Sequence, residues 1–255
     1  TDLRRLGRKH DLAEARRAID IAQATFDRVS FDLIYARQYQ SLSDWERELA
    51  EALRITTGHL SLYQLTVEDG TVFGERFARG QLRGLPSEDL AADFFDLTQT
   101  MCTDAGLPAY EISNHARPGQ ESRHNRIYWT GGDYAGIGPG AHGRLTYGRQ
   151  RHATAAIAQP ADWLAEAAST EGVQDSPAAL SSQEQAIEYL LMGLRLRDGI
   201  RLSRLAGFTG RDLAGSRLAG LRDLGMVQQS DDRLSVTDRG RPLLNAILAE
   251  LTADI

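Results

Sequence analysis

The first half of the chain alternates between helix-type and strand-type patterns of hydrophobic residues. Apolar residues recur at helical spacing in residues 12–26, 41–53 and 87–101, and the second and third of these stretches begin with a serine that can cap a helix. Two short apolar runs, residues 29–35 and 60–67, have the composition of strands. Strands that are apolar on both faces and alternate with helices are typical of a parallel sheet covered by helices. The pattern predicts an α/β fold, and because two strands alone make no stable parallel sheet, we expect further strands upstream of the first residue.

The regular alternation stops after Gly106. Residues 109–113 have the composition of a third strand, whereas residues 114–150 are rich in glycine and are predicted to be irregular. Residues 168–180 are polar and contain a proline, which predicts a linker.

The last part of the chain has a mainly helical pattern. One helix is predicted to begin after Ser181, because Glu184 follows it at capping-box spacing. The elements predicted after it are two helices at residues 201–207 and 210–225, a two-stranded wing at 226–237 and a helix at 238–251. This order of elements predicts a winged-helix domain.

Composition narrows the possible classes of function. The 255 residues are 42% hydrophobic and 25% charged, which is typical of a globular protein, and no run of about 18 apolar residues predicts a membrane span. The net charge of −6 argues against a general binder of nucleic acids or anionic membranes. Winged helices often bind DNA, but residues 181–255 hold ten Arg against ten Asp or Glu and no basic stripe, so no nucleic-acid partner is expected.

Cys102 is the only cysteine, so this chain alone forms neither an intramolecular disulfide nor a cysteine-based metal cluster. It lies on the apolar side of a predicted helix, and we expect a buried structural thiol. A reducing compartment, the cytoplasm, fits this cysteine usage best. No signal peptide is visible, and the charged start at Thr1 suggests that an N-terminal segment is missing.

Asp32 interrupts an otherwise apolar strand. A buried carboxylate is costly unless it is paired or hydrogen-bonded. One hypothesis is a structural ion pair with a nearby arginine. The other is that Asp32 accepts hydrogen bonds from hydroxyl groups of a ligand, because residues near the carboxyl ends of barrel strands face the active site.

The segment around His124 combines histidine, flat aromatic rings and glycine at unusual density. A neutral imidazole is a good iron ligand, and the nearby Tyr128 and Trp129 supply apolar faces suited to a macrocycle. The alternatives are a structural role for this histidine and iron ligation by His115 or His142.

Gly136, Gly138 and Ala141 match the pattern G-x-G-x-x-A. A dinucleotide-binding loop also needs a strand before it and a helix opening after it, and Pro139 lies inside the motif. We therefore expect no nucleotide here. We expect these glycines to let the backbone pack against a flat ligand or a neighbouring strand.

Several motifs, in this order, resemble the HemW family: "LGRKH", "VSFDLIY", "YEISNHARPG", "HNRIYW" and "GIGPGAHGR". These are radical S-adenosylmethionine (SAM) proteins that are regarded as haem chaperones and are related to oxygen-independent coproporphyrinogen III oxidases. The resemblance covers essentially the whole chain. It implies the C-terminal part of a (β/α)6 partial barrel in residues 1–115, an α+β connector carrying the HNxxYW segment in 116–175, and a winged-helix domain in 176–255.

The resemblance also implies a set of ligand contacts. Arg8 would contact the methionine or ribose region of SAM, Asp32 the ribose hydroxyls, and Ile34 and the backbone near Thr66 the adenine. The H-N-x-x-Y-W motif makes His124 the expected ligand of the haem iron, with Tyr128 and Trp129 beside the haem.

One departure from the family matters for function. The C-x-x-x-C-x-x-C motif is absent, so this chain can hold no [4Fe-4S] cluster and cannot cleave SAM. The resemblance implies a haem chaperone that uses SAM and a cluster in the intact protein. Its expected partners are haem and a haem-accepting protein, either free in the cytoplasm or associated with a membrane. The alternatives are an oxidase that decarboxylates coproporphyrinogen and a degenerate remnant without function.

Overall fold

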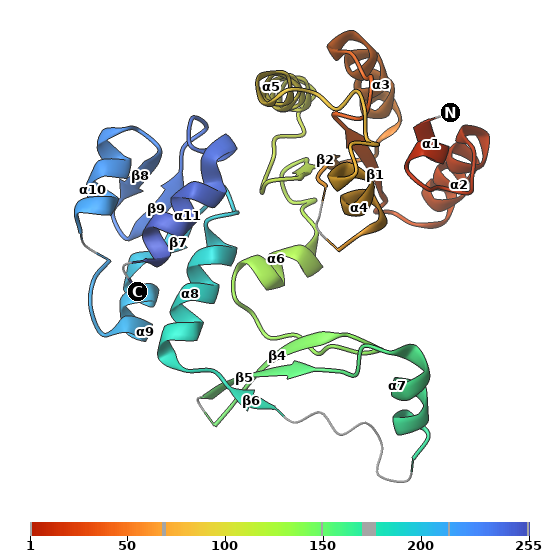
Figure 1. The fold of residues 1–255 in the computed structure, drawn as a ribbon. Helices are drawn as coiled ribbons and strands as arrows, with labels where there is room; N and C mark the ends of the chain where they lie inside the picture. Colours follow the sequence, from red (N-terminus) through yellow and green to blue (C-terminus); the bar gives the residue numbers. More distant parts are fainter. Residues whose placement is uncertain (1, 68–69, 149, 170–176, 214, 254) are drawn as a thin grey trace. The chain divides into compact units, whose positions relative to one another are not determined.

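The computed structural model describes all residues except 1, 68–69, 149, 170–176, 214 and 254 (Figure 1). The chain forms two compact units, Thr1–Glu121 and Ser122–Ile255. The three-region division made from the sequence remains a prediction.

The first unit contains a three-stranded sheet. Strands β1 (Ser30–Tyr35) and β2 (His59–Gln64) are parallel, as predicted, and pair in register from Ser30 opposite His59 to Tyr35 opposite Gln64. The third strand is not residues 109–113 but β3 (Asn114–Ala116), which is antiparallel to β2. The prediction was wrong because the chain turns within this segment, where the Tyr110 N–H donates to the carbonyl of Asn114.

Several helices accompany these strands in the described part of the first unit. They are α1 (Asp2–Arg5), α2 (Leu12–Thr25), α3 (Leu42–Ile55), α4 (Val72–Ala78) and α5 (Glu88–Asp104). The predicted serine caps are present: Ser41 accepts a hydrogen bond from the Asp44 N–H, and Ser87 accepts one from the Leu90 N–H.

Helices α3 and α5 cover one face of the sheet and build the core of the first unit (Figure 1). Trp45 and Phe94 are both 0% exposed, and the indole N–H of Trp45 donates to the hydroxyl of Thr98 over 2.8 Å. Tyr35 of β1 stacks on Trp45 with ring centroids 5.0 Å apart. Cys102 is buried in this core as predicted, and burial raises the pKa of its thiol to about 12.

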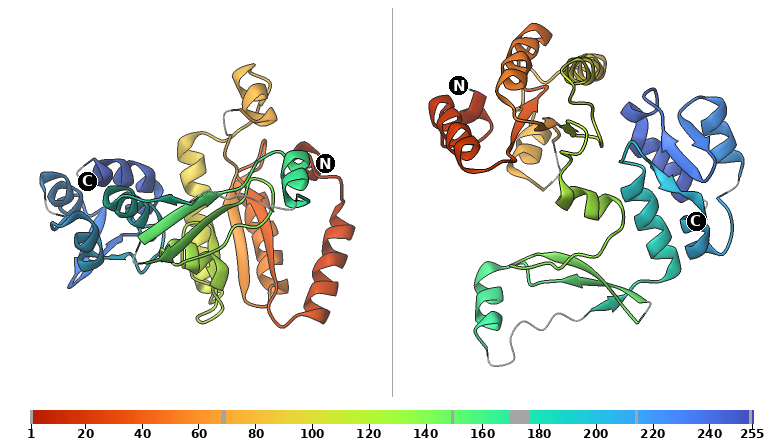
Figure 2. Two further views of the ribbon diagram at one scale, coloured as in Figure 1. Left: turned by 90° about the horizontal axis from the view of Figure 1, so that it is seen from below. Right: turned by 180° about the vertical axis from the view of Figure 1, so that it is seen from behind.

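The second unit begins with a helix and a β-hairpin where the sequence predicted irregular chain. Helix α6 (Arg123–Trp129) precedes strands β4 (His142–Tyr147) and β5 (Gln150–Ala155), which pair antiparallel and lie side by side (Figure 2). The glycines that suggested irregular chain lie mainly between these elements. Helix α7 (Pro160–Ala167) follows β5. Of the predicted linker, residues 170–176 lie outside the described residues, and β6 (Ala178–Ala179) pairs with β5.

The remaining elements follow the predicted order. They are α8 (Ser182–Gly193), β7 (Ile200–Arg201), α9 (Leu202–Thr209), α10 (Ser216–Asp223), β8 (Val227–Ser230), β9 (Arg233–Val236), η1 (Arg241–Leu243) and α11 (Leu244–Thr252). The capping box between Ser181 and Glu184 is present. Helix α10 is shorter than predicted, because Gly210 takes a left-handed conformation and ends α9. Among the described helices, none is long and apolar enough to cross a membrane.

We predict that Phe94→Ala lowers the free energy of unfolding of the first unit by about 3–5 kcal/mol, because it leaves a cavity in the core. Phe77→Ala removes the same atoms from a side chain that is 55% exposed and should cost far less. Urea unfolding monitored by tryptophan fluorescence measures both. Equal losses would contradict the packing of Phe94 in the core.

The pH dependence of stability should report His59, which is 8% exposed between Ser30 and Tyr110. Burial, and secondarily the charge of Arg28, lower the pKa of His59 in the folded state. The unfolded chain therefore binds a proton that the folded chain rejects, and stability should fall as the pH drops from about 7.5 to about 5.5. In His59→Gln this part of the slope should disappear. An unchanged slope in that variant would show that His59 is not kept neutral.

Candidate functional site

The two faces of strand β1 differ in what they contact. Phe31, Leu33 and Tyr35 pack toward the core under α3 and α5. Asp32 and Ile34 alternate with them and so lie on the opposite face. Asp32 is exposed and forms no hydrogen bond or ion pair with any residue that the structure describes. The expectation of a buried carboxylate was therefore wrong, because the side chain faces away from the helices.

The neighbouring strands add polar groups to this face. Ser61 lies opposite Asp32 in the parallel pair, and Asn114 lies opposite Ser61 in the antiparallel pair. Burial, and next the Asp32 carboxylate, raise the pKa of Tyr63, which lies opposite Ile34. The Oδ1 atom of Asn114 is buried and accepts no hydrogen bond from the described residues. This face thus offers acceptors for the hydroxyl or amino groups of a small molecule.

The other residues predicted to contact SAM lie at the edges of this face. Thr66 is exposed and lies two positions past the end of β2. The Leu65 N–H donates to the Tyr35 carbonyl, which keeps Ile34 and Thr66 at the same end of the sheet. Arg8 follows α1, is exposed, and is linked to Asp32 by no hydrogen bond or ion pair among the described residues. Asp32 and Ile34 thus share one face of β1, and Thr66 follows the strand paired with it. The contacts expected between these residues, Arg8 and SAM remain predictions.

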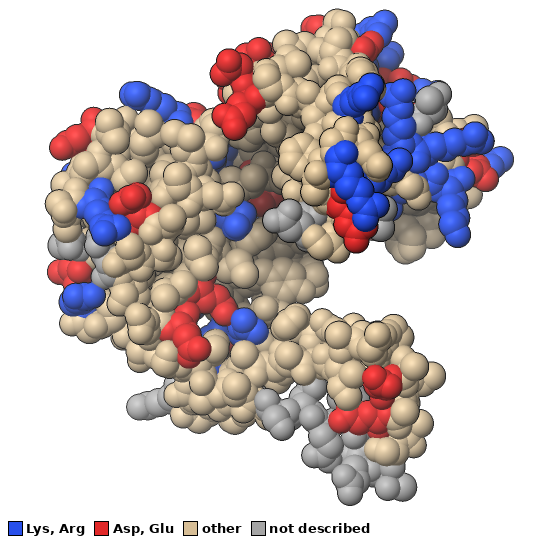
Figure 3. Space-filling model, viewed as in Figure 1, with Lys and Arg blue, Asp and Glu red and all other residues tan. Residues whose placement is uncertain are grey.

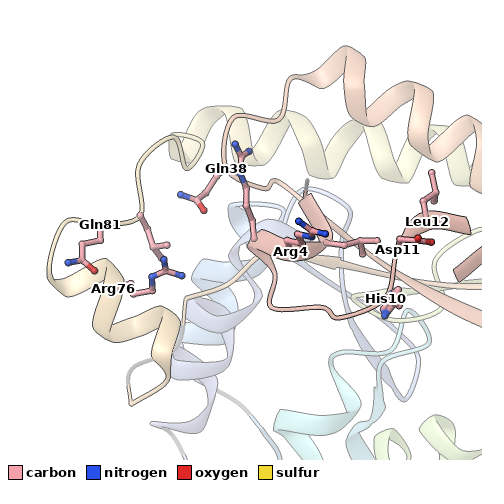
Figure 4. A pocket seen from close by; sticks show the side chains of 10 residues that line it. Arg4, His10, Asp11, Leu12, Gln38, Arg76 and Gln81 are labelled. Carbon is pink, nitrogen blue, oxygen red and sulfur yellow. The ribbon is translucent and has the colours of Figure 1, made fainter. Parts of the chain in front are cut away.

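A basic cavity of about 740 Å³ lies at the carboxyl ends of the same strands. Figure 4 shows Arg4 and His10 from the N-terminal segment, Gln38 from the loop after β1, and Arg76 from α4 along its walls. In the space-filling view, Lys and Arg side chains gather over this part of the first unit (Figure 3). A cavity at this end of parallel strands is where α/β folds bind ligands. None of the four residues expected to contact SAM lines it.

In the second unit, the HNxxYW segment forms helix α6, whose two ends are fixed by specific caps. The side chain of Ser122 accepts a hydrogen bond from the Asn125 N–H at the start. At the end, Gly131 has a φ of +65°, and the N–H groups of Gly131 and Gly132 donate to the carbonyls of Tyr128 and Ile127. This is the Schellman arrangement, which needs a left-handed residue and explains the glycine.

Two arginines bind the carbonyl groups that follow this helix. Arg204 donates to the carbonyls of Thr130 and Gly131 over 2.8 and 3.1 Å. Arg151 donates to the carbonyls of Gly131 and Gly132 over 3.1 and 3.0 Å. Neither arginine could be predicted from the motif, because each is far from it along the chain.

The rings of His124, Tyr128 and Tyr134 form a small aromatic cluster with edge-to-face contacts. The hydroxyl of Tyr128 lies 2.6 Å from the Nε2 atom of His124, and the two rings meet edge to face at 4.5 Å. Tyr134 meets Tyr128 edge to face at 4.3 Å. His124 is exposed, and its Nδ1 atom has no hydrogen-bond partner among the described residues. The geometry fits an imidazole that can ligate a metal through one nitrogen.

Trp129 lies differently from Tyr128. Its indole N–H is buried and donates to no described residue. The guanidinium of Arg195 lies 5.6 Å from the ring centroid. Trp129 therefore contacts Arg195, whereas the ring of Tyr128 contacts His124 and Tyr134.

The other two candidate histidines are less suited to iron. His115 is 1% exposed and lies in β3, where its ring meets Gln99 at 3.3 Å. His142 is exposed at the first position of β4.

The glycines after α6 serve a strand contact. A Cβ atom on Gly136 would lie 2.5 Å from the carbonyl oxygen of His142, and one on Gly143 would lie 2.4 Å from the Thr154 hydroxyl. Tyr134 and Arg144 exchange backbone hydrogen bonds across the same contact. Strand β4, not a helix, follows this stretch, so the G-x-G-x-x-A match is no dinucleotide loop.

The residues of this chain do not fit an iron–sulfur cluster. Thiolates hold such clusters, and the one cysteine is buried with a raised pKa. Within the described part of the chain, no group of three or more His, Cys, Asp or Glu side chains could hold a metal ion.

Comparison with known proteins gives the fold of this chain and its relatives in sequence. A solved structure of coproporphyrinogen III oxidase (HemN) from Escherichia coli, described as a radical SAM enzyme, superposes with a TM-score of 0.73. It is 18% identical, and the match covers 99% of this chain and 61% of that one. The chain therefore has the fold of part of a radical SAM protein. The sequence model of the HemN C-terminal domain matches residues 180–243.

Two relatives are more similar in sequence. Radical S-adenosyl methionine domain-containing protein 1 from Dictyostelium discoideum is 34% identical over 98% of this chain and 63% of that protein. The haem chaperone HemW from Lactococcus lactis is 31% identical over 99% of this chain and 66% of that protein. Both are similar to this chain over nearly its whole length, and the chain spans less than two thirds of theirs.

We predict that Gly143→Ala destabilises the second unit by roughly 1–3 kcal/mol, because its Cβ would collide with Thr154 and with the chain at Gly136. Gly207→Ala, at a helical glycine with open space around it, should be neutral or stabilising by up to about 1 kcal/mol. Thermal unfolding of both variants measures the difference. Equal stability would mean that the segment 134–136 does not lie against β4.

Proposed function

We propose that this chain is the haem-handling part of a haem chaperone-like protein, which binds haem and passes it to an acceptor protein. The observation that carries the proposal is the exposed imidazole of His124 on a helix capped at both ends, in a chain related to HemW. A fixed helix keeps the imidazole in one place, and its exposure leaves room for a large planar ligand.

The proposed haem contacts are His124, Tyr128 and Trp129. His124 supplies the ligand of the iron. The Tyr128 hydroxyl contacts His124 Nε2 at 2.6 Å, and the two rings meet edge to face. Trp129 is the weakest of the three, because Arg195 lies over its ring and its N–H is buried.

We propose that SAM binds along the open face of β1 in the intact protein. Asp32 would accept hydrogen bonds from the ribose hydroxyls, Ile34 and the backbone near Thr66 would flank the adenine, and Arg8 would bind the methionine or ribose part. The support is the unpaired, exposed Asp32 and the buried Oδ1 of Asn114 on the same face. Bound SAM would supply the radical chemistry of the family, with a [4Fe-4S] cluster held by residues outside this chain.

The alternative is an oxygen-independent coproporphyrinogen III oxidase. Its support is a likeness in fold at 18% identity, whereas relatives named haem chaperones are 31–35% identical. Vinyl products from coproporphyrinogen with the complete protein would favour the oxidase.

The proposed partners are haem and an acceptor protein that is either free or membrane-associated. A cytoplasmic location remains our proposal. Related proteins from Dictyostelium discoideum and Mus musculus carry the label mitochondrial in their names.

We predict that His124→Ala weakens haem binding by roughly tenfold or more, because it removes the iron ligand. Haem titration followed by the Soret band measures the affinity. His142→Ala, which removes another exposed imidazole of the same unit, is the matched control and should bind as the unchanged chain does. If both variants bind equally well, the iron is held elsewhere.

A further inference from the structure

Among the residues that the structure describes, one of the two ring nitrogens of His124 has a hydrogen-bond partner. The Nε2 atom lies 2.6 Å from the hydroxyl of Tyr128, four positions further along the same helix. The Nδ1 atom has no partner among the described residues. A metal that bound Nε2 would have to displace the phenol, which costs about 0.5–1.5 kcal/mol for a typical hydrogen bond. Binding at Nδ1 costs no such bond.

The partner of His124 is itself held in place. The ring of Tyr128 lies edge to face against Tyr134 at 4.3 Å with an interplanar angle of 90°. Tyr134 is fixed by two backbone hydrogen bonds with Arg144, of 2.7 and 2.8 Å, at the edge of strand β4. Tyr134 is thus held by the sheet edge, Tyr128 packs on Tyr134, and His124 contacts Tyr128. This series of contacts fixes the orientation of the exposed imidazole.

We propose that Tyr128 is a positioning residue that accepts the Nε2–H of His124, so that Nδ1 carries the lone pair which ligates the haem iron. Metal-binding histidines generally donate their other N–H to a fixed acceptor, which selects the tautomer and raises the basicity of the ligating nitrogen. No proton is lost or gained in this arrangement: the neutral imidazole keeps its single proton on Nε2, and the phenol keeps its own. The proposal rests on the proposed haem function and specifies the atom and the residue that serve it.

The tautomer can be measured without haem. In the chain with ¹⁵N-labelled histidine, long-range ¹H–¹⁵N spectra distinguish a protonated from an unprotonated ring nitrogen, and His124→Gln assigns the signals. We expect protonated Nε2 and unprotonated Nδ1 in the unchanged chain. Tyr128→Phe should shift both signals toward a mixture of tautomers. Tyr134→Phe removes the hydroxyl of the next ring in the same cluster and should leave both histidine signals unchanged.

Haem affinity gives a second, independent measurement. Tyr128→Phe should weaken haem binding by about 10-fold or more, and Tyr134→Phe by less than about 2-fold. A proton on Nδ1 in the unchanged chain, or equal haem affinity in the two tyrosine variants, would overturn the proposal. A failure of the proposed function would look different, because His124→Ala would then bind haem as the unchanged chain does. The spectra recorded without haem would still show which nitrogen of His124 carries the proton.

Discussion

The geometry of the HNxxYW segment depends on the hydrogen bonds accepted by the last carbonyl groups of helix α6. A helix leaves its final carbonyls without partners inside the helix, and each buried one must find a donor. Here the turn at Gly131 satisfies two of them, and Arg204 and Arg151 bind the carbonyls that follow. Because guanidinium groups donate in a fixed, planar fork, they constrain direction as well as distance. The direction of α6 within its unit follows from these bonds.

Arg151 also connects the end of α6 to a wider network of ion pairs. Arg151 also pairs with Asp133 at 3.1 Å and lies 3.6 Å from Glu188 of helix α8. Glu188 in turn binds Arg144 of β4 at 2.8 Å. Ion pairs of this kind add little net stability, but breaking one leaves a half-buried charge without a partner. Their contribution is to fix how helix, hairpin and helix fit together within the second unit.

The sequence predicted elements well where local signals agree. The caps at Ser41, Ser87 and Ser181 precede helices with a regular apolar period, and all three helices are present. The segment from 114 to 150 was predicted to be irregular because its glycines outweighed the weak helical signal of a seven-residue helix. The signals that could have revealed α6 are the Ser122 cap, the glycine at position 131 and the spacing of His124 and Tyr128 by four positions.

The candidate sites were only partly predictable, because strand alternation is local whereas packing between distant segments is not. Asp32 and Ile34 share a strand face by simple alternation, and so do Ser61 and Tyr63 on the next strand. Which of the two faces the helices would cover depends on packing between distant segments. Tyr134, Arg151 and Arg204 reach the motif only through such long-range packing, so the local pattern carried no sign of them.

Two histidine–tyrosine pairs in this chain show how burial decides what the same chemistry can do. His59 meets the hydroxyl of Tyr110 at 3.0 Å, and its other nitrogen meets Ser30 at 2.6 Å, so both nitrogens are occupied inside the fold. Burial lowers its pKa, and the pair serves the structure of the first unit. His124 meets Tyr128 at a comparable distance but is exposed and keeps one nitrogen without a partner among the described residues. Since a ligand needs both access and a vacant lone pair, only the second pair meets the physical requirements of a metal-binding imidazole.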